Sequence, residues 1–323
     1  NNIRLWDHRP LKDTYNQIQA IRLYYDFNDV DVDRYIIDGE YRQVMLSARE
    51  LSAEKLAGEA QTWVNRRLQF THGYGIALSP VNDVSAEGLP LLLVKDIPPV
   101  GDFEIERPQI YFGEKTNNYV IVNTKTQEFD YPMGEENVYG HYEGKDGVNI
   151  GSFVRRAVYA WQFGDFNILI SGELMPESRA LYYRNIAERV NHLAPFLELD
   201  SDPYIVTIEG RLFWIQDAYT TSDRYPYSAP LGGGLNYIRN SVKAGIGAYD
   251  GRATFYCTEP EDALEQTYQA IFPELFVPAE QMPESLRVHR RYPEDMFNIP
   301  ALVYQSYHMR DARVFYNKED LWA

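Results

Sequence analysis

The sequence of 323 residues contains a single cysteine, Cys257. One cysteine excludes a disulfide framework within the chain and a zinc or iron–sulfur site built from several cysteines. Cys257 alternates with Ala253 and Phe255 in the string ATFYC, which predicts an inert thiol on the buried face of a strand rather than a nucleophile. The lack of disulfides does not fix the compartment, because cytoplasmic proteins and many bacterial extracytoplasmic domains share it.

Long apolar runs are also missing. No stretch approaches the roughly 18 residues that a membrane-spanning helix needs. The first residue is Asn1 rather than methionine, and no signal-peptide pattern follows it. We therefore expect the chain to be a piece of a longer protein.

Basic side chains are scarce, with 31 Lys and Arg against 47 Asp and Glu, so the formal net charge is −16. The field of such a protein repels phosphate backbones and anionic headgroups, and we expect no nucleic-acid partner. The charges are dispersed without blocks of one sign, which favours a solvated acidic surface over a disordered tail.

What is abundant is tyrosine, with 26 residues, in a chain that is 45% hydrophobic and therefore able to bury sizeable cores. Tyrosine joins an apolar ring to a hydrogen-bonding end and suits half-buried interaction surfaces. Tyrosine-rich strands packed together would explain the excess equally well.

Metal and cofactor signatures are absent. The histidines do not fall in HExxH or a similar ligand spacing; they are His8, His72, His141, His192, His289 and His308. No GxSxG elbow, Walker A loop or GxGxxG after a strand occurs. We therefore predict no metal and no cofactor, and the sequence names no catalytic residue.

A calcium loop is considered at Asp29, Asp31, Asp33 and Glu40, which stand at positions 1, 3, 5 and 12 of an EF-hand. Arg34 occupies the position of the glycine that such a loop needs for its sharp turn. A strand with Val30 and Val32 facing inward and the acids facing outward fits the pattern better.

Local patterns predict a mixture of strands and helices. Strands are expected within 18–48, with Asp38-Gly39 as a hairpin turn, and turn-rich β-structure over 75–131. Helices are expected from Ser52 to about Gln69, from Ser152 to Gly164 with Phe153 on the core face, and from Ser178 to Leu193.

Turn and capping residues also predict the elements of the last third of the sequence. Two hairpins are predicted around Glu209-Gly210 and Asp250-Gly251. Thr258 and Glu261 form a capping box for a helix through Ile271, and a helical tyrosine-rich tail precedes a short strand, ARVFY. Together these elements predict an α+β fold with largely antiparallel sheets, either as lobes 1–198 and 199–323 or as one continuous domain.

Two stretches are candidates for a functional site. In Thr71-His72-Gly73-Tyr74-Gly75, two glycines permit close backbone approach beside an imidazole that titrates near neutrality, although a simple glycine turn explains the string as well. His72 and Tyr74 are its candidate residues.

The second candidate is a predicted loop, 217–228. Its side chains could bind a sugar or a partner protein, or they could satisfy the backbone of the loop itself. The candidate residues are Asp217, Tyr219, Thr220, Thr221, Ser222, Asp223, Arg224, Tyr225 and Tyr227.

Several long strings in order, among them TWVNRRLQFTHGYG, RPQIYFGE, APFLELDSDPY, NYIRNSVKA and RYPEDMF, resemble the uncharacterised bacterial membrane-protein family UPF0182. The resemblance extends from about Ile18 to Trp322. It implies an extracytoplasmic soluble region that follows transmembrane helices in the cell membrane, with those helices among its partners. The family has no agreed activity, so the resemblance assigns no catalytic residue.

The leading hypothesis is accordingly an extracytoplasmic binding or interaction module for an envelope protein or a glycan. The alternative is an envelope hydrolase in which His72 and a carboxylate such as Asp217 or Asp223 act as acid and base.

Overall fold

The computed structural model describes residues 2–101, 103–134, 136–231 and 234–322. The chain divides into two compact units. The first contains residues 1–193, 204–214 and 245–253, and the second contains 194–203, 215–244 and 254–323.

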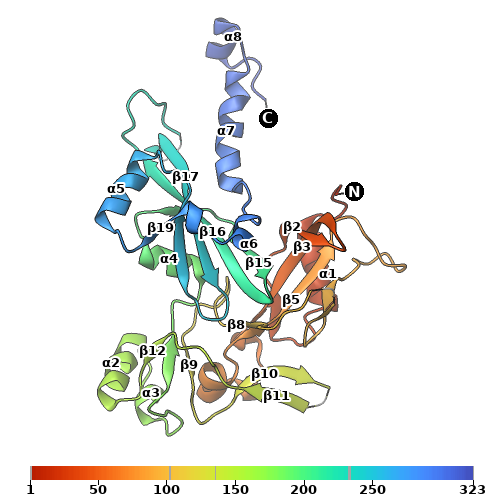
Figure 1. Cartoon of the computed structure of the whole chain (residues 1–323), viewed down its shortest axis with the longest axis vertical. Coiled ribbons are helices and arrows are strands. Elements are labelled where there is room, and N and C mark those ends of the chain that lie inside the picture. The colour runs from red at the N-terminus through yellow and green to blue at the C-terminus, as the bar shows by residue number, and fades with distance from the viewer. Residues whose placement is uncertain (1, 102, 135, 232–233, 323) are drawn as a thin grey trace. The chain divides into compact units, whose positions relative to one another are not determined.

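The first unit is built on an antiparallel sheet of strand order β1-β3-β5-β6-β7, with β2 also paired to β3 (Figure 1). The strands are β1 (Tyr25–Phe27), β2 (Asp31–Ile37), β3 (Glu40–Leu51), β5 (Ile76–Pro80), β6 (Val94–Lys95) and β7 (Val100–Gly101). The predicted turn at Asp38-Gly39 joins β2 to β3, and both turn residues have positive φ, at 53° and 77°. That backbone matches the twist of a two-residue hairpin.

Helix α1 (His8–Ile18) packs on this sheet. Asp7 caps it by accepting a hydrogen bond from the N–H of Arg9, and Leu11 and Tyr15, one helical turn apart, are buried. The hydroxyl of Tyr15 lies 2.6 Å from the hydroxyl of Ser79 on β5, so the helix is joined to the sheet by a buried polar contact.

Smaller elements complete the first unit. Its further sheets pair β4 (Gly73–Tyr74) with β8 (Gln109–Ile110), β10 (Glu128–Met133) with β11 (Glu136–Gly140), and β13 (Arg179–Leu181) with both β12 (Val148–Asn149) and β9 (Val120–Val122). The helices are α2 (Phe153–Phe163), α3 (Asn167–Ile170) and α4 (Ile186–Leu193). Helix α2 begins and ends as predicted, because Ser152 accepts from the N–H of Arg155 and Gly164 adopts φ 63°. Phe153, however, is 73% exposed, so its predicted place on the core face is wrong.

Two predicted helices are wrong in part. Between Ser52 and Gln69 the chain forms short turns, η1 (Ala53–Lys55) and η2 (Gly58–Ala60), before a final helical segment that ends with a π-helical stretch, η3 (Asn65–Gln69). The helix is interrupted because Leu56 and Ala57 are extended, which lets Leu56 turn into the core.

The stretch predicted as a helix from Ser178 is a strand, β13, in its first part. Hydrogen bonding between strands determines this, because β13 pairs with β12 on one side and β9 on the other. Only the second part is helical, as α4.

The second unit contains a sheet of order β14-β16-β17-β18-β19. Its strands are β14 (Glu198–Leu199), β16 (Arg211–Ser222), β17 (Tyr237–Gly247), β18 (Ala253–Cys257) and β19 (Phe276–Pro278); the long strands β16 and β17 also contribute residues to the first unit. The predicted hairpin at Glu209-Gly210 joins β15 (Tyr204–Ile208) to β16. Cys257 is buried on β18, as predicted, and burial raises the pKa of its thiol.

The helices of the second unit are α5 (Ala263–Ile271), α6 (Glu284–Arg287), α7 (Glu294–Tyr307) and α8 (Ala312–Asn317), with the 3-10 turn η5 (Ala279–Gln281) before α6 (Figure 1). The cap of α5 is Asp262 rather than Thr258, because the Asp262 carboxylate accepts the N–H groups of Leu264 and Glu265. The predicted strand ARVFY is helix α8, which Asp311 caps in the same manner.

The mixture of helices and mostly antiparallel sheets confirms the predicted α+β class. Among the described residues, none of the helices combines the length and the apolar character that crossing a membrane requires.

Candidate functional site

The first part of the predicted loop 217–228 is not a loop but the end of strand β16, where its side chains are buried. Asp217 forms an ion pair with Lys243 of β17, and both are almost fully buried. The hydroxyl of Tyr219 donates to the carboxylate of Asp200, and the hydroxyl of Thr220 donates to that of Asp262. These three candidates use their polar groups within the second unit.

The second part of the stretch begins with the last two residues of β16 and then leaves the sheet as an exposed loop. Thr221 and Ser222 are half-buried, whereas Asp223, Arg224 and Tyr225 are exposed. The Asp223 carboxylate lies 3.6 Å from the guanidinium of Arg224, a surface contact of little energetic weight. The exposed candidates therefore keep hydrogen-bonding capacity for a ligand.

The exposed loop has a defined internal structure. The side chain of Asn236 accepts from the N–H of Tyr225 at 2.9 Å and donates to its carbonyl at 2.9 Å, and Ser228 donates to the Asn236 carbonyl at 2.7 Å. The ring of Tyr225 stacks on that of Tyr237, with centroids 4.7 Å apart. Tyr227 is fully exposed and adopts φ 61°, a conformation that costs free energy for a residue other than glycine.

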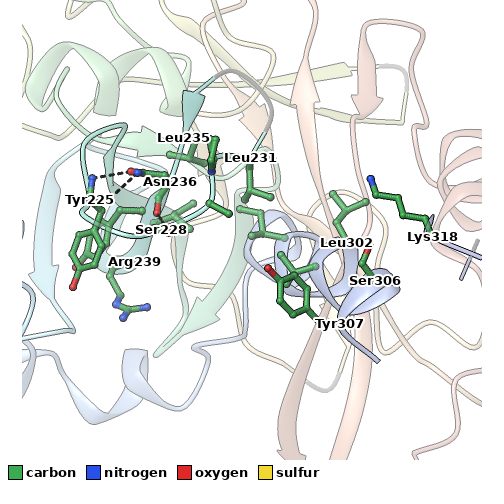
Figure 2. Close-up of a pocket in the computed structure, with 16 residues that line it drawn as sticks. Tyr225, Ser228, Leu231, Leu235, Asn236, Arg239, Leu302, Ser306, Tyr307 and Lys318 are labelled. Atoms are coloured by element: carbon green, nitrogen blue, oxygen red, sulfur yellow. Dashed lines mark hydrogen bonds between the residues drawn. The ribbon is translucent and has the colours of Figure 1, made fainter. Parts of the chain in front are cut away.

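A pocket of about 670 Å³ opens beside this loop within the second unit. Figure 2 shows the loop residues, including Tyr225 and Asn236, on one side and residues of α7 and the end of α8, including Leu302 and Lys318, on the other. The aliphatic lining residues are Leu231, Leu235, Ile238, Ile299, Leu302 and Val303. The pocket therefore offers a mainly aliphatic floor with a tyrosine pair at one edge.

The charge of this pocket differs from that of the whole chain. Its described lining includes the cationic side chains of Arg239 and Lys318 and no carboxylate, although acidic residues outnumber basic ones by 47 to 31 in the sequence. Arg239 lies over the ring of Tyr237, 5.4 Å from its centroid. An anionic group in this pocket would meet positive charge without facing a carboxylate in the described lining.

The buried carboxylate of Asp262 contacts a residue that lines the pocket, Tyr237. It accepts hydrogen bonds from the hydroxyls of Thr220, Ser241 and Tyr237 as well as the two N–H groups at the start of α5. Burial alone would raise the pKa of Asp262, but these donors hold it below its ordinary value. Burial and the bond to Asp262 raise the pKa of Tyr237 to about 12. Asp262 thus fixes a ring that lines the pocket.

His72 and Tyr74, the other candidates, lie in the first unit and are buried. His72 is 2% exposed; its Nε2 lies 3.1 Å from Asp130, and its Nδ1 lies 2.9 Å from the hydroxyl of Thr71. The same Thr71 hydroxyl donates to the buried carboxylate of Glu128 at 2.6 Å. The carboxylate contacts of His72 are therefore Asp130 and Glu128, in an enclosed network that offers a substrate almost no imidazole surface.

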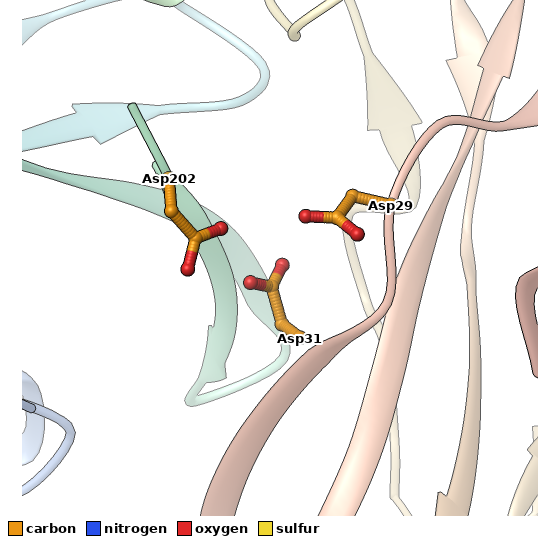
Figure 3. Close-up of side chains that lie close together, drawn as sticks. All are labelled: Asp29, Asp31 and Asp202. Carbon is orange, nitrogen blue, oxygen red and sulfur yellow. The ribbon is translucent and has the colours of Figure 1, made fainter. Parts of the chain in front are cut away.

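The acidic stretch considered as a calcium loop begins β2. Figure 3 shows Asp29 and Asp31 in the first unit. Asp29 accepts from the N–H of Val30 at 2.7 Å, and Asp31 accepts from the N–H of Ile205 on β15 at 3.0 Å. The strand is confirmed, but Asp31 and Asp33 are buried rather than outward-facing. For Asp31, the backbone of β15 supplies a donor. Asp202, also drawn in Figure 3, belongs to the second unit and pairs with Arg291 at 2.6 Å.

Sequence reasoning missed several lining residues, above all Arg239, Lys318 and Leu302. They stand up to about a hundred positions from the loop, and no local pattern joins them to it. The signal for this side of the pocket lies in the structure, where the apolar residues Phe297, Leu302, Val303 and Tyr304 of α7 remain exposed on a helix without buried residues.

Comparison with known proteins gives a consistent result. The model of the uncharacterised protein family UPF0182 matches residues 1–323. UPF0182 proteins of Pelotomaculum thermopropionicum, Desulforamulus reducens and Cupriavidus necator are 56%, 53% and 55% identical, each over 100% of this chain. The chain covers only 35%, 35% and 36% of those relatives. No solved structure matches. The chain spans about a third of the length of these relatives, and it belongs to the UPF0182 family.

Proposed function

We propose that this chain is the extracytoplasmic part of a membrane protein and acts there as a polypeptide-binding module. Its pocket, lined by residues within 225–231 and 235–239, by α7 and by Lys318 after α8, would hold an apolar segment that carries an acidic residue. Membership of UPF0182 supports the extracytoplasmic location, because the family that the sequence resembles is one of proteins with transmembrane helices. The composition of the pocket supports the binding of a polypeptide.

The observation that carries the proposal is the combination of an aliphatic floor with a cationic edge. Six leucine, isoleucine and valine side chains line the pocket, and burying apolar groups of a ligand against them stabilises the complex by about 25 cal/mol per Å² of apolar surface. Arg239 and Lys318 then select a carboxylate, because the described lining contributes no competing acid.

A glycan suits this pocket less well than a polypeptide does. The rings of Tyr225 and Tyr237 stack on each other, so one face of each is already covered. Asn236 uses its side-chain amide and carbonyl on Tyr225, and Ser228 uses its hydroxyl on Asn236. Few polar groups remain for the many hydroxyls of a sugar.

Binding is tested with two synthetic peptides that share an apolar centre of leucine and valine and differ in their flanks, which are glutamates in one and lysines in the other. Fluorescence anisotropy should show binding of the glutamate-flanked peptide at least about tenfold tighter than that of the lysine-flanked peptide. Arg239→Glu should remove the preference, whereas Arg224→Glu, a charge reversal outside the pocket lining, should preserve it. Equal binding of both peptides, or binding of neither, would refute the proposed occupant, and binding of oligosaccharides alone would assign the pocket to glycans.

The location is tested in intact cells that produce the full-length protein with its other reactive cysteines replaced. Tyr227 is fully exposed, so Tyr227→Cys should react with a membrane-impermeant maleimide from outside the cell. Trp214→Cys, at a buried position, should not react until the protein is unfolded. Labelling of the Tyr227 variant only after the membrane is broken would place the region on the cytoplasmic side.

A further inference from the structure

A second pocket, of about 550 Å³, lies in the first unit and takes no part in the function proposed above. The end of α2, the segment 117–119 before β9, and the chain from β13 into α4 form its walls. Its volume is within the range of small-molecule sites. Four aromatic rings from these three segments line it, those of Tyr119, Phe163, Tyr182 and Tyr183.

The rings form a continuous, ordered set. Tyr119 and Phe163 are stacked, with centroids 4.4 Å apart and an interplanar angle of 8°. Tyr182 meets Phe163 edge-on at 5.6 Å and contacts Tyr183 at 5.0 Å. Tyr183 has φ 48° and remains 38% exposed. A tyrosine in this strained backbone conformation, with its ring kept partly open to solvent, is the kind of outlier found at binding sites.

The polar side chains of the pocket carry both signs of charge. Arg67 lies over the ring of Tyr119, 4.4 Å from its centroid. Asp165 accepts from the hydroxyl of Tyr119 at 2.6 Å, from the backbone and side chain of Asn167, and from the indole N–H of Trp63 at 2.9 Å. Burial would raise the pKa of Asp165, but these donors lower it. Glu188 is exposed at the rim and lies 3.7 Å from His192.

These charges decide between classes of ligand. An organic cation would gain from the carboxylates, but the guanidinium of Arg67 would repel it and already lies over the ring of Tyr119, on which Phe163 also stacks. A phosphate or carboxylate would suit Arg67 but would meet Asp165 and Glu188. A neutral ligand with many hydroxyls escapes both repulsions. Its hydroxyls can donate to the exposed carboxylate of Glu188 and accept from the guanidinium of Arg67 and from the amides of Asn117, Asn118 and Gln162.

We propose that this pocket binds an uncharged saccharide. The apolar C–H face of a pyranose ring would pack on the part of the Tyr183 ring that its contacts with Tyr182 and His192 leave open. The hydroxyls of the sugar would bond to Arg67, Glu188 and the amide side chains around it.

The indole N–H of Trp63 provides a built-in reporter, because it donates to the lining residue Asp165. The five tryptophans of the chain give few indole signals in a ¹H–¹⁵N spectrum, and a Trp63→Phe variant assigns the one that matters. Maltotriose and tri-N-acetylchitotriose are titrated to about 20 mM, a concentration that reveals millimolar affinity. At least one of them should shift the Trp63 signal in a saturable manner.

Tyr183→Asn tests the stacking surface, since asparagine tolerates positive φ better than most residues and spares the backbone. We expect about a fivefold loss of affinity, as for the loss of one aromatic contact. Tyr139→Asn is the matched control: Tyr139 is 42% exposed, lies on β11 of the same unit and does not line the pocket. It should leave the affinity within twofold.

Three outcomes overturn the proposal. They are the absence of any saturable shift of the Trp63 signal, equal effects of the Tyr183 and Tyr139 variants, and a response to tetramethylammonium or inorganic phosphate instead of either saccharide. Because the two pockets lie in different units, the peptide experiment on the second unit succeeds or fails independently.

Discussion

Replacement of Asp262 by alanine is expected to destabilise the second unit strongly. This carboxylate is 5% exposed and accepts five hydrogen bonds, from the N–H groups of Leu264 and Glu265 and from three hydroxyls. Loss of the helix cap costs about 1 kcal/mol. Each buried hydroxyl that loses a charged acceptor costs a further ~1 kcal/mol or more.

The sum must be reduced where the donors retain partners. The hydroxyls of Thr220 and Ser241 lie 2.8 Å apart and can still bond to each other, and the half-buried Tyr237 can turn to water. A total of about 3 kcal/mol for Asp262→Ala, and about 2 kcal/mol for the isosteric Asp262→Asn, follows from these contributions.

Because the chain divides into two units, the opening free energy is best measured locally, by hydrogen exchange of the α5 amides at pH 7. Asp223→Ala is the control, since Asp223 belongs to the same unit but is exposed, and it should change the value by less than about 0.5 kcal/mol. A loss below about 1 kcal/mol for Asp262→Ala, or equal losses for both variants, would refute the assigned role of this carboxylate.

The pH dependence follows from the direction of the pKa shift. The pKa of Asp262 is lower in the folded chain than in the unfolded one, so its stabilising effect is complete above the unfolded value of about 4 and disappears as the pH falls through the folded value. The difference between the original chain and Asp262→Asn should therefore be largest near pH 7 and shrink below about pH 4. A difference that grows on acidification would contradict the reasoning.

Three further predictions concern single side chains. Burial raises the pKa of Glu265, so its ionised form destabilises the fold as the pH rises through the folded pKa. Glu265→Gln should therefore raise the α5 opening free energy, measured by hydrogen exchange, by about 1 kcal/mol at pH 7 and leave it unchanged near pH 4. A gain at pH 4 that vanishes at pH 7 would refute the direction of the shift. Arg184 is buried and donates to the carbonyls of Thr71, Tyr111 and Asn118. Arg184→Lys cannot reach all three and should lower the free energy of unfolding of the first unit in urea by about 3 kcal/mol. An unchanged free energy would show that the carbonyls find other donors. Trp161 is 86% exposed on α2, so Trp161→Ser should change stability by less than about 0.5 kcal/mol, and a large loss would mean that this ring is covered in solution.

Features determined by neighbours in sequence were predictable. The turns Asp38-Gly39 and Glu209-Gly210 require residues that accept positive φ, and the start and end of α2 depend on Ser152 and Gly164. Each of these is a local backbone requirement. No distant contact is needed to satisfy it.

Features determined by distant partners were not predictable. Residues 179–181 have no helical preference strong enough to oppose pairing with β9 and β12, the strands on either side of β13. Asp31 is buried on β2, against the expected alternation of polar and apolar residues, because the N–H of Ile205, far along the chain, donates to its carboxylate. In both cases a contact remote in sequence overrides the local pattern.

The candidate site divides by the same criterion. The sequence predicts Asp217, Thr220 and His72 as binding or reactive side chains. In the structure they contact Lys243, Asp262 and Asp130, respectively, and these contacts use their hydrogen-bonding capacity. Sequence shows which groups could bind a ligand and cannot show which are already bonded.

A group whose donors and acceptors are satisfied inside the fold contributes stability, whereas ligand binding needs capacity that folding leaves unused. Asp217→Ala should therefore act mainly on stability, because it leaves the ammonium of Lys243 buried without its counter-ion. Arg239 lines the pocket and makes no ion pair among the interactions of the described residues, so its replacement should act mainly on binding. Such a separation between the two variants is what distinguishes a framework residue from a ligand contact, and it cannot be obtained from the side-chain chemistry of either residue alone.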